Sequence, residues 1–171
     1  TGRAHISTTM NDGLYYEVIS ELTGFEIGGE EELISLLKDL AEMKARYDKV
    51  KEALDEAEAR LEGILLTHGH FDHTASVDKL RETFPVPLAV HAEDAVMLTD
   101  GRINGYFDFF GREQTHRPAA RVVLDGDIIT LGNEEIKVIH TPGHSRGSCC
   151  FLAKDEDGKD FLISGDTLFS D

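Results

Sequence analysis

The residues best suited to chemistry lie in one short stretch, Thr67-His68-Gly69-His70-Phe71-Asp72-His73. It places three imidazoles and one carboxylate within six residues, directly after the apolar run Ile64-Leu65-Leu66, which predicts a short buried strand. Histidines two positions apart cannot share a helical face, but they can converge from a strand end and the loop that comes after it. Neutral imidazole binds zinc, iron and other transition metals, and a carboxylate adds a harder oxygen ligand. The stretch therefore predicts a metal site, against the alternative of a polar turn that happens to be rich in histidine.

Two further stretches place a single ligand-type side chain just after a predicted strand. His144 follows the strand that ends at His140, and Asp166 follows a strand at residues 161–163. A neighbouring glycine in each stretch allows close backbone approach. Taken alone, such a histidine is usually an ordinary polar residue and a Gly-Asp pair is usually a turn. Together with the first stretch, both are expected to be ligands gathered at one edge of a sheet.

The elements that must position these ligands are short and come after residue 63. Strands are expected at 64–66, 88–90, 122–124, 128–131, 136–140, 148–153 and 161–164, and helices at 74–83 and 92–98. Residues 99–120 are expected to be a loop that carries the aromatic group Tyr106, Phe107, Phe109 and Phe110. This succession of elements predicts an α/β or α+β fold in layers.

A long helix is predicted from Glu30 to Glu62, because this segment lacks Gly and Pro and is rich in helix formers. Its apolar residues alternate at intervals of three and four over about four heptads, the spacing of a coiled-coil seam. The helix could lie on its own domain, bend near residues 45–48, or pair with another chain as a homo-oligomer. A second helix is expected at residues 14–22. The chain is therefore divided into a helical N-terminal region, 1–62, and a metal-binding region, 63–171, within one compact domain.

The composition limits the partners. The 171 residues carry 33 acidic against 17 basic side chains, a formal net charge of −16. Such a field repels phosphate backbones and anionic lipid, so we expect neither a nucleic acid nor a membrane as partner. The two cysteines, Cys149 and Cys150, are adjacent and cannot form an ordinary bridge with each other. With no basic, apolar leader at the N-terminus, these features predict a cytoplasmic protein.

The combined motifs resemble the metallo-β-lactamase-fold hydrolases, most closely their glyoxalase II-like branch. The resemblance rests on His68-x-His70-x-Asp72-His73, on Thr-Pro-Gly-His144-Ser and on Ser-Gly-Asp166-Thr-Leu-Phe, and it extends from about residue 61 to residue 171. It implies an αββα sandwich.

The resemblance also implies roles for these residues. His68, His70 and His144 would hold a first metal, Asp72 and His73 a second, and Asp166 would bridge the two. The implied cofactor is Zn²⁺, one or two per chain, with iron or manganese as alternatives. Two such ions lower the pKa of a shared water, and the resulting hydroxide attacks an ester, thioester or lactam. Asp72 is the expected catalytic residue, which orients the attacking water or relays its proton.

The chain departs from the family pattern at both ends. Nothing before residue 61 reads as the two strands that usually precede the histidine stretch, and the last histidine ligand of the family has no counterpart before Asp171. His5 or His116 could supply that ligand, whereas His140 is expected to be structural and His91 to pack or to support a ligand. The Gly2-Arg3 pair and the helix at 14–22 resemble the segment that often follows the Gly-Asp-Thr-Leu-Phe motif in family members, against the alternative that Gly-Arg is a chance dipeptide. The fold is therefore expected to be incomplete, rearranged or circularly permuted at the N-terminus.

These observations predict a metal-dependent hydrolase that acts on a small-molecule thioester or ester. Two alternatives stay open. One is a single-iron enzyme similar to the persulfide dioxygenases, which would use only part of the cluster. The other is a metal-binding oligomerisation module with little or no turnover, assembled through the 30–62 helix.

Overall fold

The computed structural model of the chain describes residues 30–132, 134–155 and 157–169, apart from some side chains of the first helix. The chain divides into two compact units, Thr1–Lys44 and Ala45–Asp171, and both sheets lie in the second. The predicted division at residue 62 stays a prediction. The helix expected at 14–22 and the rearrangement hypothesis concern residues outside the described ranges.

The first described element is helix α2, Glu30–Glu56, about 40 Å long at 1.5 Å per residue. The prediction that it continues to residue 62 is wrong. Glu58 adopts a positive φ of 49°, and the N–H groups of Glu58 and Ala59 return to carbonyls of the last turn at 3.2 and 2.9 Å. This pair of bonds is a Schellman motif, which ends the helix. The side chains of Leu33, Leu36, Leu40 and Met43 in the proposed heptad seam lie outside the described residues, so the seam and the oligomer stay predictions.

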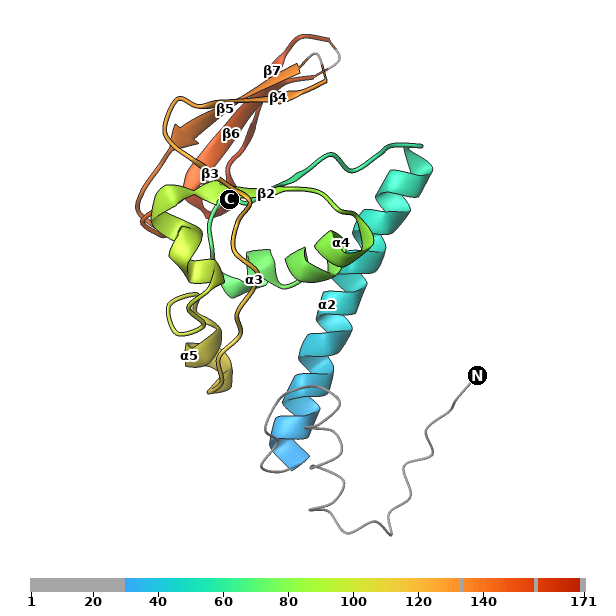
Figure 1. The fold of residues 1–171 in the computed structure, drawn as a ribbon, viewed down its shortest axis with the longest axis vertical. Coiled ribbons are helices and arrows are strands. Elements are labelled where there is room, and N and C mark those ends of the chain that lie inside the picture. The colour runs from blue at the N-terminus through green and yellow to red at the C-terminus, as the bar shows by residue number, and fades with distance from the viewer. Residues whose placement is uncertain (1–29, 133, 156, 170–171) are drawn as a thin grey trace. The chain divides into compact units, whose positions relative to one another are not determined.

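Sheet A is parallel and carries the first ligand stretch at its edge strand. It consists of β1 (Ile64–Leu65), β2 (Leu88–His91) and β3 (Arg121–Val123), in that order. Helices α3 (Phe71–Thr74) and α4 (Val77–Thr83) connect β1 to β2, and η1 (Ala92–Leu98) and α5 (Tyr106–Phe110) lie between β2 and β3 (Figure 1). Since the carboxyl ends of parallel strands share one edge, loops after β1 and β2 lie side by side there.

Two predicted elements in this half differ from the structure. The single helix expected at 74–83 is two helices, because Ser76 leaves helical geometry with φ −106° and ψ 0° before α4 begins. The segment expected to be a loop at 99–120 contains α5. This short helix lies between Gly105 and Gly111, whose φ angles of 84° and 67° allow the chain to turn in and out of it.

Sheet B is an antiparallel meander. Its strands are β4 (Ile128–Leu131), β5 (Glu134–His140), β6 (Cys149–Lys154) and β7 (Asp160–Ile163), in chain order. The turn at 125–127 is closed by Asp127, whose Oδ2 accepts the N–H of Leu124 at 2.9 Å. All four strands were predicted to within two residues at their ends, as period-two patterns between turn signals allow.

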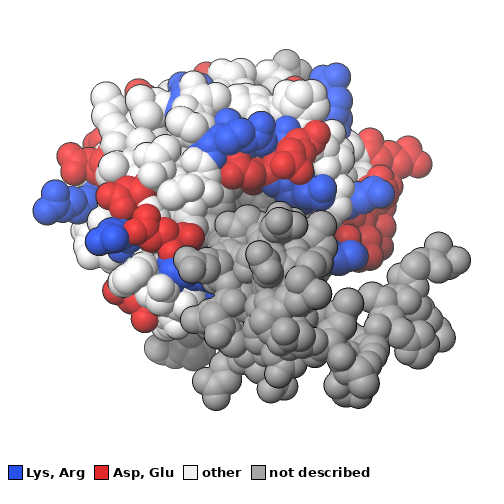
Figure 2. All heavy atoms as spheres, turned by 60° about the horizontal axis from the view of Figure 1, so that its bottom comes forward, with Lys and Arg blue, Asp and Glu red and all other residues white. Residues whose placement is uncertain are grey.

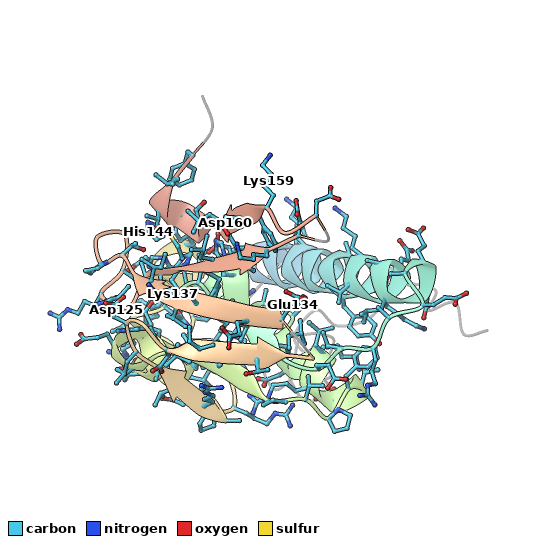
Figure 3. The ribbon with its side chains drawn as sticks, turned by 90° about the horizontal axis from the view of Figure 1, so that it is seen from above. Asp125, Glu134, Lys137, His144, Lys159 and Asp160 are labelled. Atoms are coloured by element: carbon cyan, nitrogen blue, oxygen red, sulfur yellow. The ribbon has the colours of Figure 1, made fainter. Side chains whose placement is uncertain are left out.

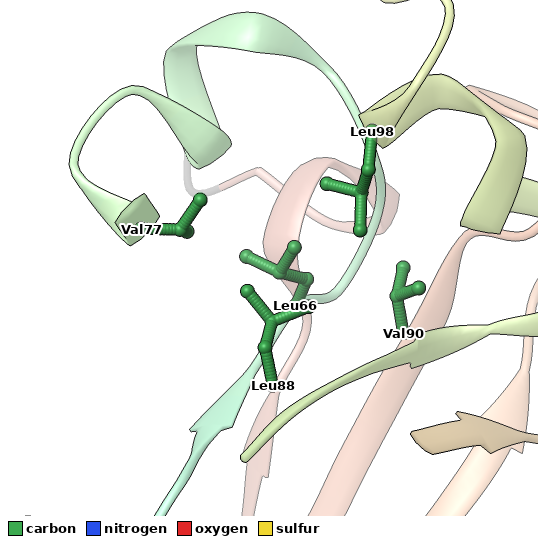
Figure 4. Close-up of a cluster of buried hydrophobic side chains, with 5 residues drawn as sticks. All are labelled: Leu66, Val77, Leu88, Val90 and Leu98. Carbon is green, nitrogen blue, oxygen red and sulfur yellow. The ribbon is translucent and has the colours of Figure 1, made fainter. Parts of the chain in front are cut away.

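Helices α4 and η1 pack on one face of sheet A. Alternate residues of a strand point to opposite faces, and Leu88 and Val90 of β2 point toward the helices. They form a buried cluster with Leu66, Val77 of α4 and Leu98 of η1 (Figure 4).

Sheet B packs on the other face of sheet A. Ala89, which lies between Leu88 and Val90, joins a second buried cluster with Val123, Val138, Cys149 and Phe151. The layers are therefore helices, sheet A and sheet B. The mixed α/β fold in layers predicted from the sequence is confirmed.

Acidic and basic side chains lie intermingled on the described part of the face drawn in Figure 2. None of the helices in the described part of the chain is long and apolar enough to cross a membrane.

Candidate metal centre

The first ligand stretch leaves sheet A at the end of β1. Its strand is fixed by the N–H of Leu66, which donates to the carbonyl of Ala89 at 3.0 Å. The chain then turns through Thr67 to His68, whose side chain is 1% exposed. Nδ1 of His68 lies 3.2 Å from the Thr67 hydroxyl, so the opposite ring nitrogen, Nε2, faces the other histidines. A partner on the second nitrogen is the usual way in which a ligand histidine is oriented.

The other two stretches leave sheet B beside it. His144 lies on the loop between β5 and β6, at the end of the sheet opposite Glu134 and Lys159 (Figure 3). That loop is joined to the first stretch where the N–H of Cys149 donates to the carbonyl of Thr67 at 2.9 Å. Asp166 lies in η2 (Gly165–Thr167), directly after β7. A Cβ on Gly165 would collide with the Thr67 side chain, so η2 packs directly on the first stretch.

The first group of ligand-type side chains is His68, His70 and His144, which each direct one ring nitrogen at the others, with these three nitrogens within 4.8 Å of one another. Nε2 of His144 is 3.2 Å from Nε2 of His68 and 2.8 Å from Nδ1 of His70. The rings meet nearly edge to face, with interplanar angles of 85–86°. Three nitrogens that converge on one point form the donor arrangement of a metal site with an open fourth position.

A second group, His68, His73 and Asp166, adjoins the first. Oδ1 of Asp166 lies 3.1 Å from Nε2 of His73, and Oδ2 lies 3.5 Å from Nε2 of His144. One carboxylate thus directs one oxygen at each group. Asp72 belongs to neither group among the described residues: its Oδ2 is 3.6 Å from Nε2 of His73, and its side chain is 46% exposed.

The electrostatics favour neutral imidazoles. Burial lowers the pKa of His68 to about 4, and the neighbouring rings of His73, His70 and His144 act in the same direction. Burial, followed by His144, also lowers the pKa of His70. A neutral ring offers a lone pair, the form that binds a metal. Since the donors are four imidazoles and a carboxylate, the residues present fit zinc or another imidazole-binding metal.

Cys149 is buried close to this cluster, yet it does not fit as a ligand. Burial raises its pKa to about 12, so it remains a neutral thiol, and its Sγ lies 3.4 Å from the carbonyl oxygen of Thr67. Both cysteines are free thiols.

The remaining histidines serve other contacts. His91 and His140 stack with ring centroids 3.9 Å apart, and the ring nitrogen Nε2 of His140 donates to the carbonyl of Arg146 at 2.8 Å. His116 is buried against Asp78 of α4, with Nδ1 3.1 Å from Oδ2, and it lies in neither ligand group. The prediction that His116 supplies a further ligand is therefore not borne out, and His5 lies outside the described residues.

Asp94 is a residue of this centre that was not predicted from the sequence. It is fully buried in η1 and accepts hydrogen bonds from both ligand-bearing loops. A signal was available, because Asp94 shares the i, i+3, i+4 spacing of an inward helical face with Met97 and Leu98. An acidic side chain on an apolar face requires buried partners.

The comparisons with known proteins agree with this geometry. The family model of the metallo-beta-lactamase superfamily matches residues 25–171. The chain is 38% identical over 106 residues to the "Probable metallo-hydrolase YqgX" of Bacillus subtilis, covering 62% of this chain and 49% of that protein. It is 34% identical over 125 residues to the hydroxyacylglutathione hydrolase of Francisella philomiragia, covering 73% of this chain and 41% of that protein.

A solved structure is also similar. The crystal structure of BLEG-1 B3 metallo-beta-lactamase matches with a TM-score of 0.63 and 35% identity, over 72% of this chain and 58% of that chain. The chain spans about half the length of the curated relatives that it matches. Since the family model covers most of the chain, and the fold and the placement of the motif residues agree with it, the chain belongs to the metallo-beta-lactamase superfamily.

Proposed function

We propose that this chain carries the metal centre of a metal-dependent hydrolase that cleaves a thioester or an ester. The observation that carries the proposal is the position of Asp166, whose two carboxylate oxygens face His73 and His144 separately. A carboxylate between two groups of imidazoles is suited to bridge two metal ions, and two-metal sites serve hydrolytic displacement. The family and the name of the Bacillus subtilis relative, a probable metallo-hydrolase, support the same reaction class.

In this proposal His68, His70 and His144 hold the first ion. His73 and Asp72 hold the second, with Asp166 between them. When bound, a pair of zinc ions would lower the pKa of a shared water and polarise the substrate carbonyl. The low pKa of His68 keeps its ring neutral at neutral pH, so that its lone pair stays available.

Asp72 is proposed to handle the proton of the attacking water. Its carboxylate is 46% exposed and lies 3.6 Å from Nε2 of His73, so it reaches both solvent and the cluster. A half-exposed carboxylate can accept a proton from water and pass it to bulk solvent. The same group can therefore act as ligand and as proton acceptor.

The substrate class rests on the relatives. The Francisella relative is named for hydroxyacylglutathione, and an acyl group on glutathione is carried by its thiol as a thioester. Hydrolysis of such a bond needs an activated water and a polarised carbonyl, and a thiolate then leaves without a general acid. In this proposal the imidazoles hold the metal that activates the water and polarises the carbonyl, and the carboxylate of Asp72 accepts the proton of the water.

The experiment combines metal counting with a substrate panel. The purified chain is loaded with zinc, iron or manganese, the bound metal is counted by elemental analysis, and hydrolysis of an acylglutathione thioester, an aryl ester and a β-lactam is monitored. We expect two zinc ions per chain and fastest turnover of the thioester. One iron per chain with oxygen uptake would replace the proposal with the dioxygenase alternative. Bound metal with no turnover on any substrate would favour a binding module.

A further inference from the structure

A buried carboxylate outside both ligand groups joins the loops that carry the ligands. Asp94 of η1 is 0% exposed. Its Oδ2 accepts the backbone N–H of Gly69 at 3.0 Å and the hydroxyl of Ser145 at 2.6 Å, and its Oδ1 accepts the backbone N–H of Gly147 at 2.7 Å. Bonds of this length to a carboxylate are among the stronger ones in proteins.

These donors are placed next to the proposed ligands. Gly69 lies between His68 and His70, and Ser145 directly follows His144. The two loops are more than seventy residues apart in the sequence. Because the carboxylate of Asp94 accepts hydrogen bonds from both, it sets how closely the loops approach each other.

The loops also pack directly against η1. A Cβ on Gly69 would lie 2.7 Å from Cβ of Met97, and a Cβ on Gly147 would lie 2.6 Å from the backbone nitrogen of Asp94. Close packing at Gly69 and Gly147 leaves neither loop room to shift toward η1. The hydrogen bonds to Asp94 oppose movement of either loop away from η1. The loops are therefore held from both directions.

The Ser145 hydroxyl extends the contact within its own loop. It lies 2.7 Å from the hydroxyl of Ser148, which also accepts the backbone N–H of Ser145 at 2.9 Å. The 145–148 turn thus has a fixed form, and Asp94 fixes where that turn sits. A buried carboxylate is costly unless such donors compensate it, which points to a specific role for this side chain rather than simple packing.

We propose that Asp94 is a positioning residue for the metal centre: it holds the loop of His68 and His70 against the loop of His144 and so sets the affinity of that three-histidine group. This inference rests on the proposed function, because it assumes that these histidines bind a metal. Asp94 itself does not touch the metal, since both its oxygens are engaged by the loops. Supporting groups of this kind typically raise metal affinity by about 10–100-fold.

The test is zinc affinity of the full chain, measured by competition with a chelating indicator, for wild type, Asp94→Asn and Ser145→Ala. Asparagine keeps the shape but replaces one acceptor oxygen with a donor, so one loop N–H faces an N–H₂ group. We expect Asp94→Asn to bind zinc about 10–100-fold more weakly and Ser145→Ala, which loses one donor of three, to show a smaller loss. The absorption spectrum of the cobalt-loaded chain should change in Asp94→Asn, because the three imidazoles would then meet the ion in altered geometry.

Glu93→Gln is the matched control. Glu93 is the exposed neighbour of Asp94, so this variant removes an adjacent negative charge without touching the loops, and its zinc affinity should stay within about threefold of wild type. Urea unfolding with chelator present shows which variants fold. Equal zinc affinity of wild type and folded Asp94→Asn overturns the inference. If Asp94→Asn does not fold, unchanged affinity in Ser145→Ala overturns it instead.

The two proposals fail differently. A wild-type chain that binds zinc tightly but hydrolyses none of the substrates would refute the proposed function and leave the role of Asp94 standing. A hydrolase whose zinc affinity is the same in Asp94→Asn would refute the role of Asp94 alone.

Discussion

The close packing of Gly147 against η1 makes a substitution there informative. Gly147→Ala adds one methyl group, and no positive φ at this position would strain the alanine backbone. The new Cβ would lie 2.6 Å from the backbone nitrogen of Asp94 and 2.7 Å from its Cγ, where ordinary contact begins at 3.4 Å. Either the loop at residue 147 or η1 at Asp94 must therefore move away from the other by about 0.8 Å.

That movement has a definite consequence. The bond from the N–H of Gly147 to Oδ1 of Asp94 is 2.7 Å long, and a displacement of about 0.8 Å would stretch it beyond the usual hydrogen-bond range. Loss of a hydrogen bond to a charged group costs about 1.5–3 kcal/mol, and a strained, unmoved loop would cost about 1–3 kcal/mol instead. We expect Gly147→Ala to lower the free energy of unfolding by about 2 kcal/mol.

Gly143→Ala is the control on the same loop. A Cβ there would meet no atom of the described residues within 4 Å, again without a positive φ. Its effect should be neutral, or stabilising by up to about 1 kcal/mol, through the unfolded state. Both variants are measured by urea unfolding with chelator present. If their free energies of unfolding agree within about 0.5 kcal/mol, the close approach of the loop to η1 is not as described.

Three other properties of the chain can be tested directly. His68→Ala should remove bound metal and hydrolysis together, as counted by elemental analysis and assay; activity that survives metal loss would contradict the mechanism. Burial lowers the pKa of His116 against the opposing effect of Asp78, so the unfolded chain takes up a proton first as pH falls from about 7 to 5, and the free energy of unfolding should fall. The fall in the free energy of unfolding with pH should be shallower in His116→Gln. The same pH dependence in wild type and His116→Gln would contradict the role of His116. Phe151→Ala, at 2% exposure, should cost about 3–5 kcal/mol in thermal or urea unfolding, whereas Phe161→Ala, at 43% exposure, should cost far less; equal losses would place Phe151 outside the core.

Much of the fold could be predicted from local patterns. The strands of sheet B show period-two patterns between turn signals, and the apolar run at 64–66 contains β1, Ile64–Leu65. The helix end at Glu58 could not be predicted, because a glutamate in left-handed geometry is uncommon and Gly63 offered a more usual stop. The break at Ser76 was missed for a similar reason, since nothing in its neighbours interrupts the helical pattern.

The sequence by itself determined which side chains are available to the metal centre and that each comes directly after a strand. It did not bring them together, because His68 follows a strand of sheet A, whereas His144 and Asp166 follow strands of sheet B. Only the tertiary structure decided how the ligands are held. The backbone partners of Asp94 lie 25 and 53 residues away, and His116 turns to Asp78 instead of the cluster. Burial and long-range hydrogen bonds of this kind arise from chain packing and leave no local periodicity from which they could be read.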